Sequence, residues 1–152
     1  MSAMIDLLRL LCVASLGVFA GAMLTEGGVL VPYWRSLSAQ EFYAWYAAND
    51  ARLLGFFGPL TTTMAILAVL AAIGGFWQVH PGRWFSAVAA VLCVFVVSTF
   101  FLYFQQANAS FTAASVSATE LPAELARWAW WHGLRTVVSF LALALALRAN
   151  SL

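Results

Sequence analysis

The sequence predicts an all-α protein, a transmembrane four-helix bundle whose helices run alternately up and down. Of its 152 residues, 64% are hydrophobic and only 9% are charged. Four apolar segments, at residues 7–31, 53–77, 84–104 and 128–147, each reach the roughly 20 residues that a helix needs to cross a hydrocarbon core. Because backbone groups must be hydrogen-bonded within lipid, helices are the expected spanning structure. The connections are short, so we expect residues 1–152 to form a single transmembrane domain.

The first apolar segment, 7–31, also has features of a secretory signal peptide. Ala20-Gly-Ala22 resembles a small-residue cleavage site after an apolar run. The apolar character continues past this site, and Arg9 interrupts the region that should be uncharged, so we expect the segment to be retained. Gly17 and Gly21 have the small-xxx-small spacing that lets helices approach closely. The neighbouring helix can belong to this chain or to a second copy in a homo-oligomer.

The second apolar segment is preceded by a helix start signal. Ser38 and Glu41 form a capping box, so we expect a helix to begin near Ala39. At about 1.5 Å per residue, a helix from there to Trp77 is far longer than a bilayer is thick. It should therefore project outward or bend near the two glycines and the proline at 55–59.

The last two segments are bounded by turn signals. Pro81-Gly82 within 78–83 is expected of a tight reversal between the second and third segments. The connection 108–121 is rich in Ser, Thr and Ala. Pro122 then fits the first position of a helix with Glu124 in its first turn.

Arginines are divided almost evenly between the two faces of the predicted bundle. Arg9, Arg83 and Arg148 fall on one face, and Arg35, Arg52 and Arg127 fall on the other. Arg83 lies in a very short connection, which favours its face as the cytoplasmic one. We therefore expect a multi-pass protein of a cell inner membrane with both termini in the cytoplasm. The net charge of +1 and the lack of a basic run argue against a nucleic-acid partner.

The fourth segment carries ionisable residues within an apolar span. His132 and Arg135 are costly at that position in a membrane, which makes them candidates for a functional site. Spacing of three and four residues places on one helical stripe Trp128, Trp131, His132, Arg135 and Ser139. Lipid disfavours this stripe, so we expect it to face the bundle interior. Glu26, near the outer end of the first segment, is the expected counter-ion of Arg135.

Up-down connectivity brings further polar residues to the same face of the membrane. The ends of the first and third segments and the starts of the second and fourth should meet there. Asn49, Gln105 and Asn108 then converge with Glu26 in the outer half of the bundle. The predicted walls of this pocket are Trp128, Trp131, Phe19, Phe56 and Phe57. Such a pocket suits a flat aromatic or quinone-like ligand with one or two oxygens.

Two simpler interpretations of the polar cluster stay open. Glu26 and Arg135 can be a buried ion pair that only holds helices together. A stable metal site needs three or four ligands, whereas only His132, Glu26 and Asp50 are available here. We therefore expect no metal, and a haem usually needs a better-placed histidine pair. Cys12 and Cys93 lack metal-ligand spacing and are expected to be buried apolar residues.

Short motifs along nearly the whole chain carry a resemblance to a known family. They are Phe19-Ala-Gly-Ala22, Val31-Pro-Tyr-Trp34, Asn49 and Pro59, and above all Arg127-Trp128, Trp131-His132 and Leu134-Arg135-Thr136. Together they resemble the small four-helix membrane proteins related to anthrone oxygenases. Most members have no assigned function, and a few convert anthrones into anthraquinones with molecular oxygen in aromatic polyketide pathways. The chain departs from the family pattern after the third segment, where more asparagines than Asn108 are expected.

The resemblance implies an oxidoreductase that acts on an anthrone- or quinol-like substrate, with molecular oxygen as co-substrate and no cofactor. Removal of the acidic benzylic proton of an anthrone gives an electron-rich enolate, which can pass an electron to oxygen directly. On this hypothesis His132 removes the proton, Arg135 stabilises the enolate oxygen, and Glu26 orients Arg135.

Substrate binding on this hypothesis relies on aromatic stacking and a few amides. The expected contacts are Trp128, Trp131, Asn49, Gln105, Asn108, Phe19 and Phe56. Two functions without catalysis are the alternatives: an accessory subunit that binds a quinone or lipid for a larger complex, and a structural or assembly protein.

Overall fold

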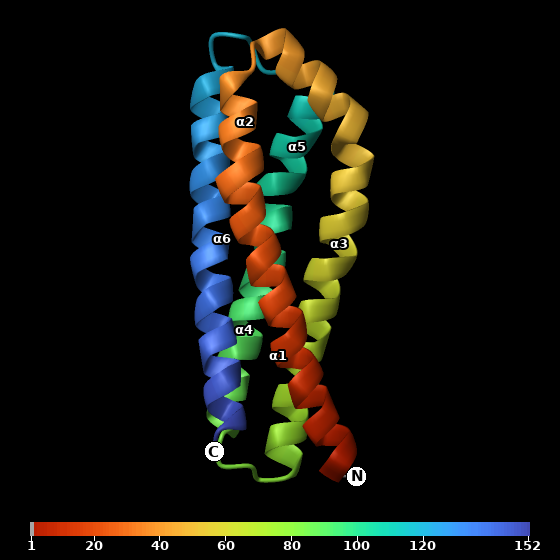
Figure 1. The fold of residues 1–152 in the computed structure, drawn as a ribbon, viewed down its shortest axis with the longest axis vertical. Coiled ribbons are helices and arrows are strands. Elements are labelled where there is room, and N and C mark those ends of the chain that lie inside the picture. Colours follow the sequence, from red (N-terminus) through yellow and green to blue (C-terminus); the bar gives the residue numbers. More distant parts are fainter. Residues whose placement is uncertain (1) are drawn as a thin grey trace.

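The computed structural model describes residues 2–152, which form four long helical rods (Figure 1). In order, the elements are α1 (Ser2–Thr25), the π-helical segment η1 (Glu26–Leu30), α2 (Val31–Ser36), α3 (Ala39–Trp77), α4 (Arg83–Thr99), the π-helical segment η2 (Phe100–Phe104), α5 (Gln105–Thr112) and α6 (Leu121–Asn150). The predicted all-α four-helix bundle is confirmed.

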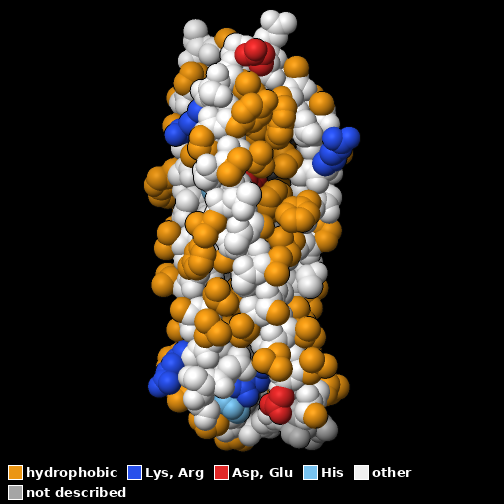
Figure 2. All heavy atoms as spheres, in the orientation of Figure 1, with side chains coloured by type: hydrophobic (Ala, Val, Ile, Leu, Met, Phe, Trp, Pro, Cys, Tyr) orange, Lys and Arg blue, Asp and Glu red, His pale blue; other side chains and the backbone are white. Residues whose placement is uncertain are grey.

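All four rods are long and apolar enough to cross a membrane. They cover Ala3–Ser36, Ala39–Trp77, Arg83–Thr112 and Leu121–Asn150. Each extends beyond the apolar segment expected from the sequence, because helical hydrogen bonding continues past the hydrocarbon-like stretch. On the face shown in Figure 2, charged side chains gather toward the two ends and hydrophobic side chains cover the middle. The chain is an integral membrane protein.

The two ends of the bundle differ in their connections. Both chain termini and the turn between α3 and α4 lie at one end, here called the terminal end (Figure 1). The α2–α3 junction and the loop between α5 and α6 lie at the other, here called the distal end. The turn packs tightly on α6, because a Cβ at Gly82 would overlap the backbone of Ala149.

The start signals read from the sequence are present in the structure. Ser38 and Glu41 form the reciprocal capping box at the start of α3, and a proline lies in the first turn of α6. The 39-residue helix α3 continues through Pro59. Figure 1 shows that it crosses the distal end and then curves along the bundle, so curvature accommodates its extra length.

The core changes character along the bundle. Toward the terminal end, α1, α3, α4 and α6 pack through small residues that include Ala68, Ala71, Ala89 and Ala142. Toward the distal end the buried side chains are mostly large rings, here called the distal aromatic cluster: Trp34, Phe42, Tyr46, Phe104, Phe111 and Trp128. Small residues let helices approach closely in a membrane, whereas large rings fill the distal half. The polar site lies where the two cores meet.

Candidate functional site

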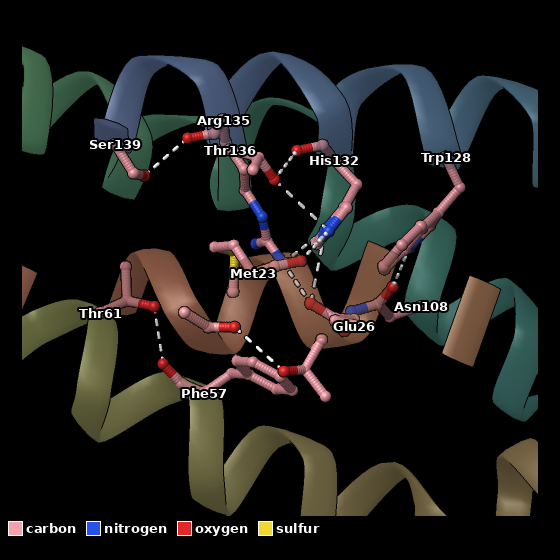
Figure 3. A network of polar contacts seen from close by, with 12 residues as sticks. Met23, Glu26, Phe57, Thr61, Asn108, Trp128, His132, Arg135, Thr136 and Ser139 are labelled. Carbon is pink, nitrogen blue, oxygen red and sulfur yellow. Dashed lines mark hydrogen bonds and ion pairs between the residues drawn. The ribbon is translucent and has the colours of Figure 1, made fainter. Parts of the chain in front are cut away.

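Glu26, His132 and Arg135 meet at the interface of the first and fourth rods. Glu26 is the first residue of η1, and the other two lie one turn apart on α6. Arg135 Nη2 donates to Glu26 Oε2 at 3.1 Å, and the same oxygen lies 3.4 Å from His132 Nδ1. Figure 3 shows the Glu26 carboxylate directed between the two α6 side chains. All three residues are buried.

The second ring nitrogen of His132 identifies its tautomer. His132 Nε2 lies 2.9 Å from the carbonyl oxygen of Met23, on α1. A carbonyl oxygen only accepts hydrogen bonds, so Nε2 carries the hydrogen. In the neutral imidazole Nδ1 then holds the lone pair. It faces Glu26 Oε2 and, at 3.5 Å, Arg135 Nη2. The basic nitrogen of His132 therefore points at the ion pair.

Arg135 is only partly satisfied by this pairing. Its guanidinium lies over the Phe104 ring, 4.3 Å from the ring centre, which is a favourable cation–π arrangement. Its Nε is buried and has no hydrogen-bond partner among the described residues. The Glu26–Arg135 pair carries no net charge, which limits the cost of burying it. One N–H of the guanidinium thus stays free to donate to a ligand.

Aromatic rings extend the site toward the distal end. The Trp128 ring stacks on His132, with 5.2 Å between ring centres and 9° between ring planes. Its Nε1 donates to Asn108 Oδ1 at 2.9 Å. Trp34 and Phe104 each meet Trp128 edge to face, with 5.2 Å between ring centres. Trp128 therefore links the polar network to the distal aromatic cluster.

Both π-helical segments contribute to the site. Glu26 opens η1, and Phe104, which lies under Arg135, closes η2. A π-helical turn contains an extra residue and redirects the side chains that follow it, and such turns occur frequently at functional sites. The two η1 glycines also matter for space: a Cβ at Gly27 would lie 3.1 Å from His132 Nε2, whereas a Cβ at Gly28 would meet nothing within 4 Å.

The structure brings together five of the residues expected at the site. Glu26, His132, Arg135, Trp128 and Asn108 form one connected set of polar and stacking contacts.

Five other expected site residues lie outside this set of contacts. Asn49 donates to the Trp45 carbonyl within α3, and Gln105 is exposed. Phe56 is 57% exposed on the lipid-facing surface, and Phe19 is fully buried in the core of the terminal half. Trp131 stacks on Tyr103 instead, with 5.5 Å between ring centres.

Several residues of the site were not expected from the sequence. Met23 contributes only its backbone carbonyl, which no side-chain pattern reveals. Phe104 and Trp34 belong to apolar and aromatic runs, where single members do not stand out. Gly27 could have been noticed, because a glycine beside a buried charged residue often allows a close approach of the backbone.

The rings around the network are in mutual contact and nearly all buried. An open surface groove of about 560 Å³ lies elsewhere, between α3 and α4, and is lined by apolar side chains that include Val69, Phe76 and Ala90. A flat ligand at the network must therefore displace rings of the distal aromatic cluster.

The side chains of the network are those of a buried ion pair with a neighbouring imidazole. Within residues 2–152, no group of three or more His, Cys, Asp or Glu side chains is placed to hold a metal ion. Glu26 and His132 are the two side chains here of types that bind metals, and the Arg135 guanidinium beside them repels a cation. Both side chains can also accept a proton.

Comparison of the chain with protein-family models, with curated proteins and with solved structures finds no match.

Proposed function

We propose that this protein is a membrane-embedded oxidoreductase that oxidises a flat, anthrone- or quinol-like substrate at the Glu26–His132–Arg135 network. The observation that carries the proposal is the orientation of His132. Its Nε2–H is held by a backbone carbonyl, so its basic Nδ1 faces a carboxylate at 3.4 Å. A buried ionisable cluster within a membrane span is a functional-site candidate by default.

The first chemical step is proton abstraction. His132 Nδ1 takes the benzylic C–H proton of the anthrone, and the C–H electron pair stays on the substrate as an enolate. The Glu26 carboxylate, whose Oε2 lies 3.4 Å from Nδ1, stabilises the positive charge of the imidazolium that forms. General-base catalysis of this kind contributes about 10²–10⁴-fold to a rate. Glu26 thus stabilises the protonated base as well as holding Arg135.

Arg135 supplies the stabilisation of the substrate anion. Its Nη2 is held by Glu26, while its Nε–H has no partner. Donation of this N–H to the enolate oxygen stabilises charge that develops in the transition state, which is the most effective use of a preorganised donor. The fixed position of the guanidinium over Phe104 keeps the donor in place.

The overall reaction balances with molecular oxygen as the oxidant. The enolate carbon gives up electrons to oxygen and forms a C–O bond. Two hydrogens leave the substrate carbon with the second oxygen atom as water, and the product is the quinone. The chain's own residues accept and return one proton and hold the anion during this sequence.

The aromatic core of the distal half supports binding of a planar molecule. This core consists of rings that meet mostly edge to face, so a ligand ring can replace a side-chain ring with little change in the kind of contact. Trp128, parallel to His132, is the natural stacking surface for such a ligand.

The test is oxygen uptake by the full-length protein in lipid nanodiscs with a hydroxylated anthrone. His132→Gln is expected to lower the protein-dependent rate by about 10²–10⁴-fold. His80→Gln is the matched control, since His80 lies in the turn at the terminal end, and it should keep the full rate. Equal rates in the wild type and His132→Gln, with both folded, would exclude the proposed base.

A purely structural role is the second candidate, and the direct pairing of Glu26 with Arg135 across two rods favours it. The carboxylate, the guanidinium and both imidazole nitrogens find partners mainly in one another and in Met23. In that case anthrone neither binds nor is consumed, and the double variant Glu26→Gln/Arg135→Leu keeps every cellular function. Binding of a quinone without turnover would instead point to an accessory subunit.

A further inference from the structure

Trp34 is a buried hydrogen-bond donor that the proposed reaction does not use. It lies on α2 and is 1% exposed. Its ring contacts the rings of four residues, with 5.2–6.2 Å between ring centres: Phe42, Trp45, Tyr46 and Trp128. Its Nε1–H has no hydrogen-bond partner among the described residues. Buried tryptophans usually place this N–H on an acceptor.

Only one other buried side-chain nitrogen or oxygen of the described residues shares this property, and it is Arg135 Nε. The two donors lie at two different rings, Trp34 and Phe104, and both of these rings contact Trp128. A buried donor without an acceptor is costly, so two beside rings that contact Trp128 point to a missing acceptor group.

The two donors are offset along the bundle axis. Arg135 is held by Glu26, and Trp34 lies about two helical turns beyond Glu26 toward the distal end. Two donors at different depths call for two acceptors. A planar molecule that carries one oxygen at each edge supplies two acceptors in a fixed relation.

We propose that Trp34 is a ligand-binding residue whose Nε1–H takes the second oxygen of the substrate. The ligand class is a fused-ring molecule with oxygens on opposite edges, as in a quinone or an anthrone hydroxylated on the edge opposite its carbonyl. The first oxygen lies at Arg135 and the ring lies along Trp128. This inference rests on the site of the proposed function and adds a specificity-determining residue to it.

The test combines a donor deletion with a ligand-oxygen deletion under anaerobic conditions. Binding of 9,10-anthraquinone, with two opposed oxygens, and of anthrone, with one, is measured by equilibrium dialysis against nanodiscs that hold the full-length protein, with empty nanodiscs subtracted. Trp34→Phe removes the N–H and keeps an aromatic ring. Trp45→Phe is the matched control, because Trp45 contacts Trp34 and is only half-buried.

Trp34→Phe should weaken anthraquinone binding roughly three- to tenfold relative to anthrone binding, the range of one neutral hydrogen bond. Trp45→Phe should leave the ratio of the two affinities unchanged. An equal loss for both ligands, or no protein-dependent binding of either, would overturn the inference. In the ¹⁵N-tryptophan spectrum of the wild type, the Trp34 indole signal, identified by its NOE contacts with the Phe42 and Tyr46 rings, should move downfield on adding anthraquinone. An unmoved signal contradicts the inference even where the variant fails to fold.

These outcomes separate the inference from the proposed function. If Trp34→Phe selectively weakens anthraquinone binding but the protein takes up no oxygen, Trp34 is a ligand donor and the proposed oxidase activity is wrong. If oxygen uptake depends on His132 but Trp34→Phe weakens the two ligands equally or not at all, the activity stands and the donor role of Trp34 is wrong.

Discussion

Addition of one methyl group at Gly27 is expected to disturb the His132 site selectively. A Cβ there lies 3.1 Å from His132 Nε2 and 3.2 Å from Cδ2, closer than ordinary van der Waals contact. The ring must move by a few tenths of an ångström, and the only hydrogen bond of Nε2–H to the backbone, to Met23 at 2.9 Å, weakens. Gly28→Ala, one residue later in η1, meets nothing within 4 Å.

The magnitude follows from two opposing terms. Leaving a buried donor unsatisfied costs about 1–3 kcal/mol, and replacing a helical glycine by alanine gains about 0.5–1 kcal/mol. No glycine of the described residues has a positive φ, so alanine is conformationally acceptable at both positions. Gly28→Ala should therefore show only the gain. The difference in unfolding free energy between the two variants therefore gives the cost of disturbing the His132 hydrogen bond, about 1–3 kcal/mol.

The assay is reversible unfolding of both variants in mixed micelles, with anthrone-dependent oxygen uptake measured in parallel. Gly27→Ala should be the less stable variant and the less active one, while Gly28→Ala should match or exceed the wild type in stability and keep its activity. Equal unfolding free energies for the two alanine variants would refute the inferred contact between the Gly27 backbone and the imidazole.

Three further predictions concern the ion pair, the terminal end and pH. Glu26→Gln or Arg135→Leu alone should lower the unfolding free energy by about 3–5 kcal/mol, because each leaves an uncompensated buried group, and the double variant should recover much of the loss in the same unfolding assay. Arg9→Leu should cost about 1.5–3 kcal/mol, because it removes a buried charged donor to the last turn of α6 at 2.7 Å; the exposed Arg148→Leu should change stability by under about 0.5 kcal/mol. Burial and, next, the positive charge of Arg9 lower the pKa of His80 from 6.5. The unfolded chain therefore binds the proton first, so stability should fall as pH drops below about 6.5, and His80→Gln should remove that part of the pH dependence.

Helical spacing was sufficient to predict the polar stripe of α6 and its partner on the first rod. The 3.6-residue period places His132 and Arg135 on one face, and the cost of lone charges in lipid requires a counter-ion, which is Glu26 in the structure. The capping box at Ser38 was predictable for the same reason: its signal is local and chemical.

The remaining substrate contacts depend on helix rotation, which the sequence pattern does not reveal. The extra residue of each π-helical segment rotates the helix that follows it, and Gln105, the first residue of α5, is exposed directly after η2. The curved path of α3 likewise leaves Asn49 bonded within its own helix and Phe56 facing outward. Small differences in rotation decide which residues face the site, and they arise from packing between rods.

The most direct measurement follows the benzylic hydrogen of an anthrone in deuterated buffer without oxygen. NMR reports its exchange in the presence of the protein and so isolates proton abstraction from every later step. Wild type and His80→Gln should accelerate the exchange, and His132→Gln should reduce it to the rate in empty nanodiscs. Undiminished exchange in folded His132→Gln would contradict the assignment of His132 as the base.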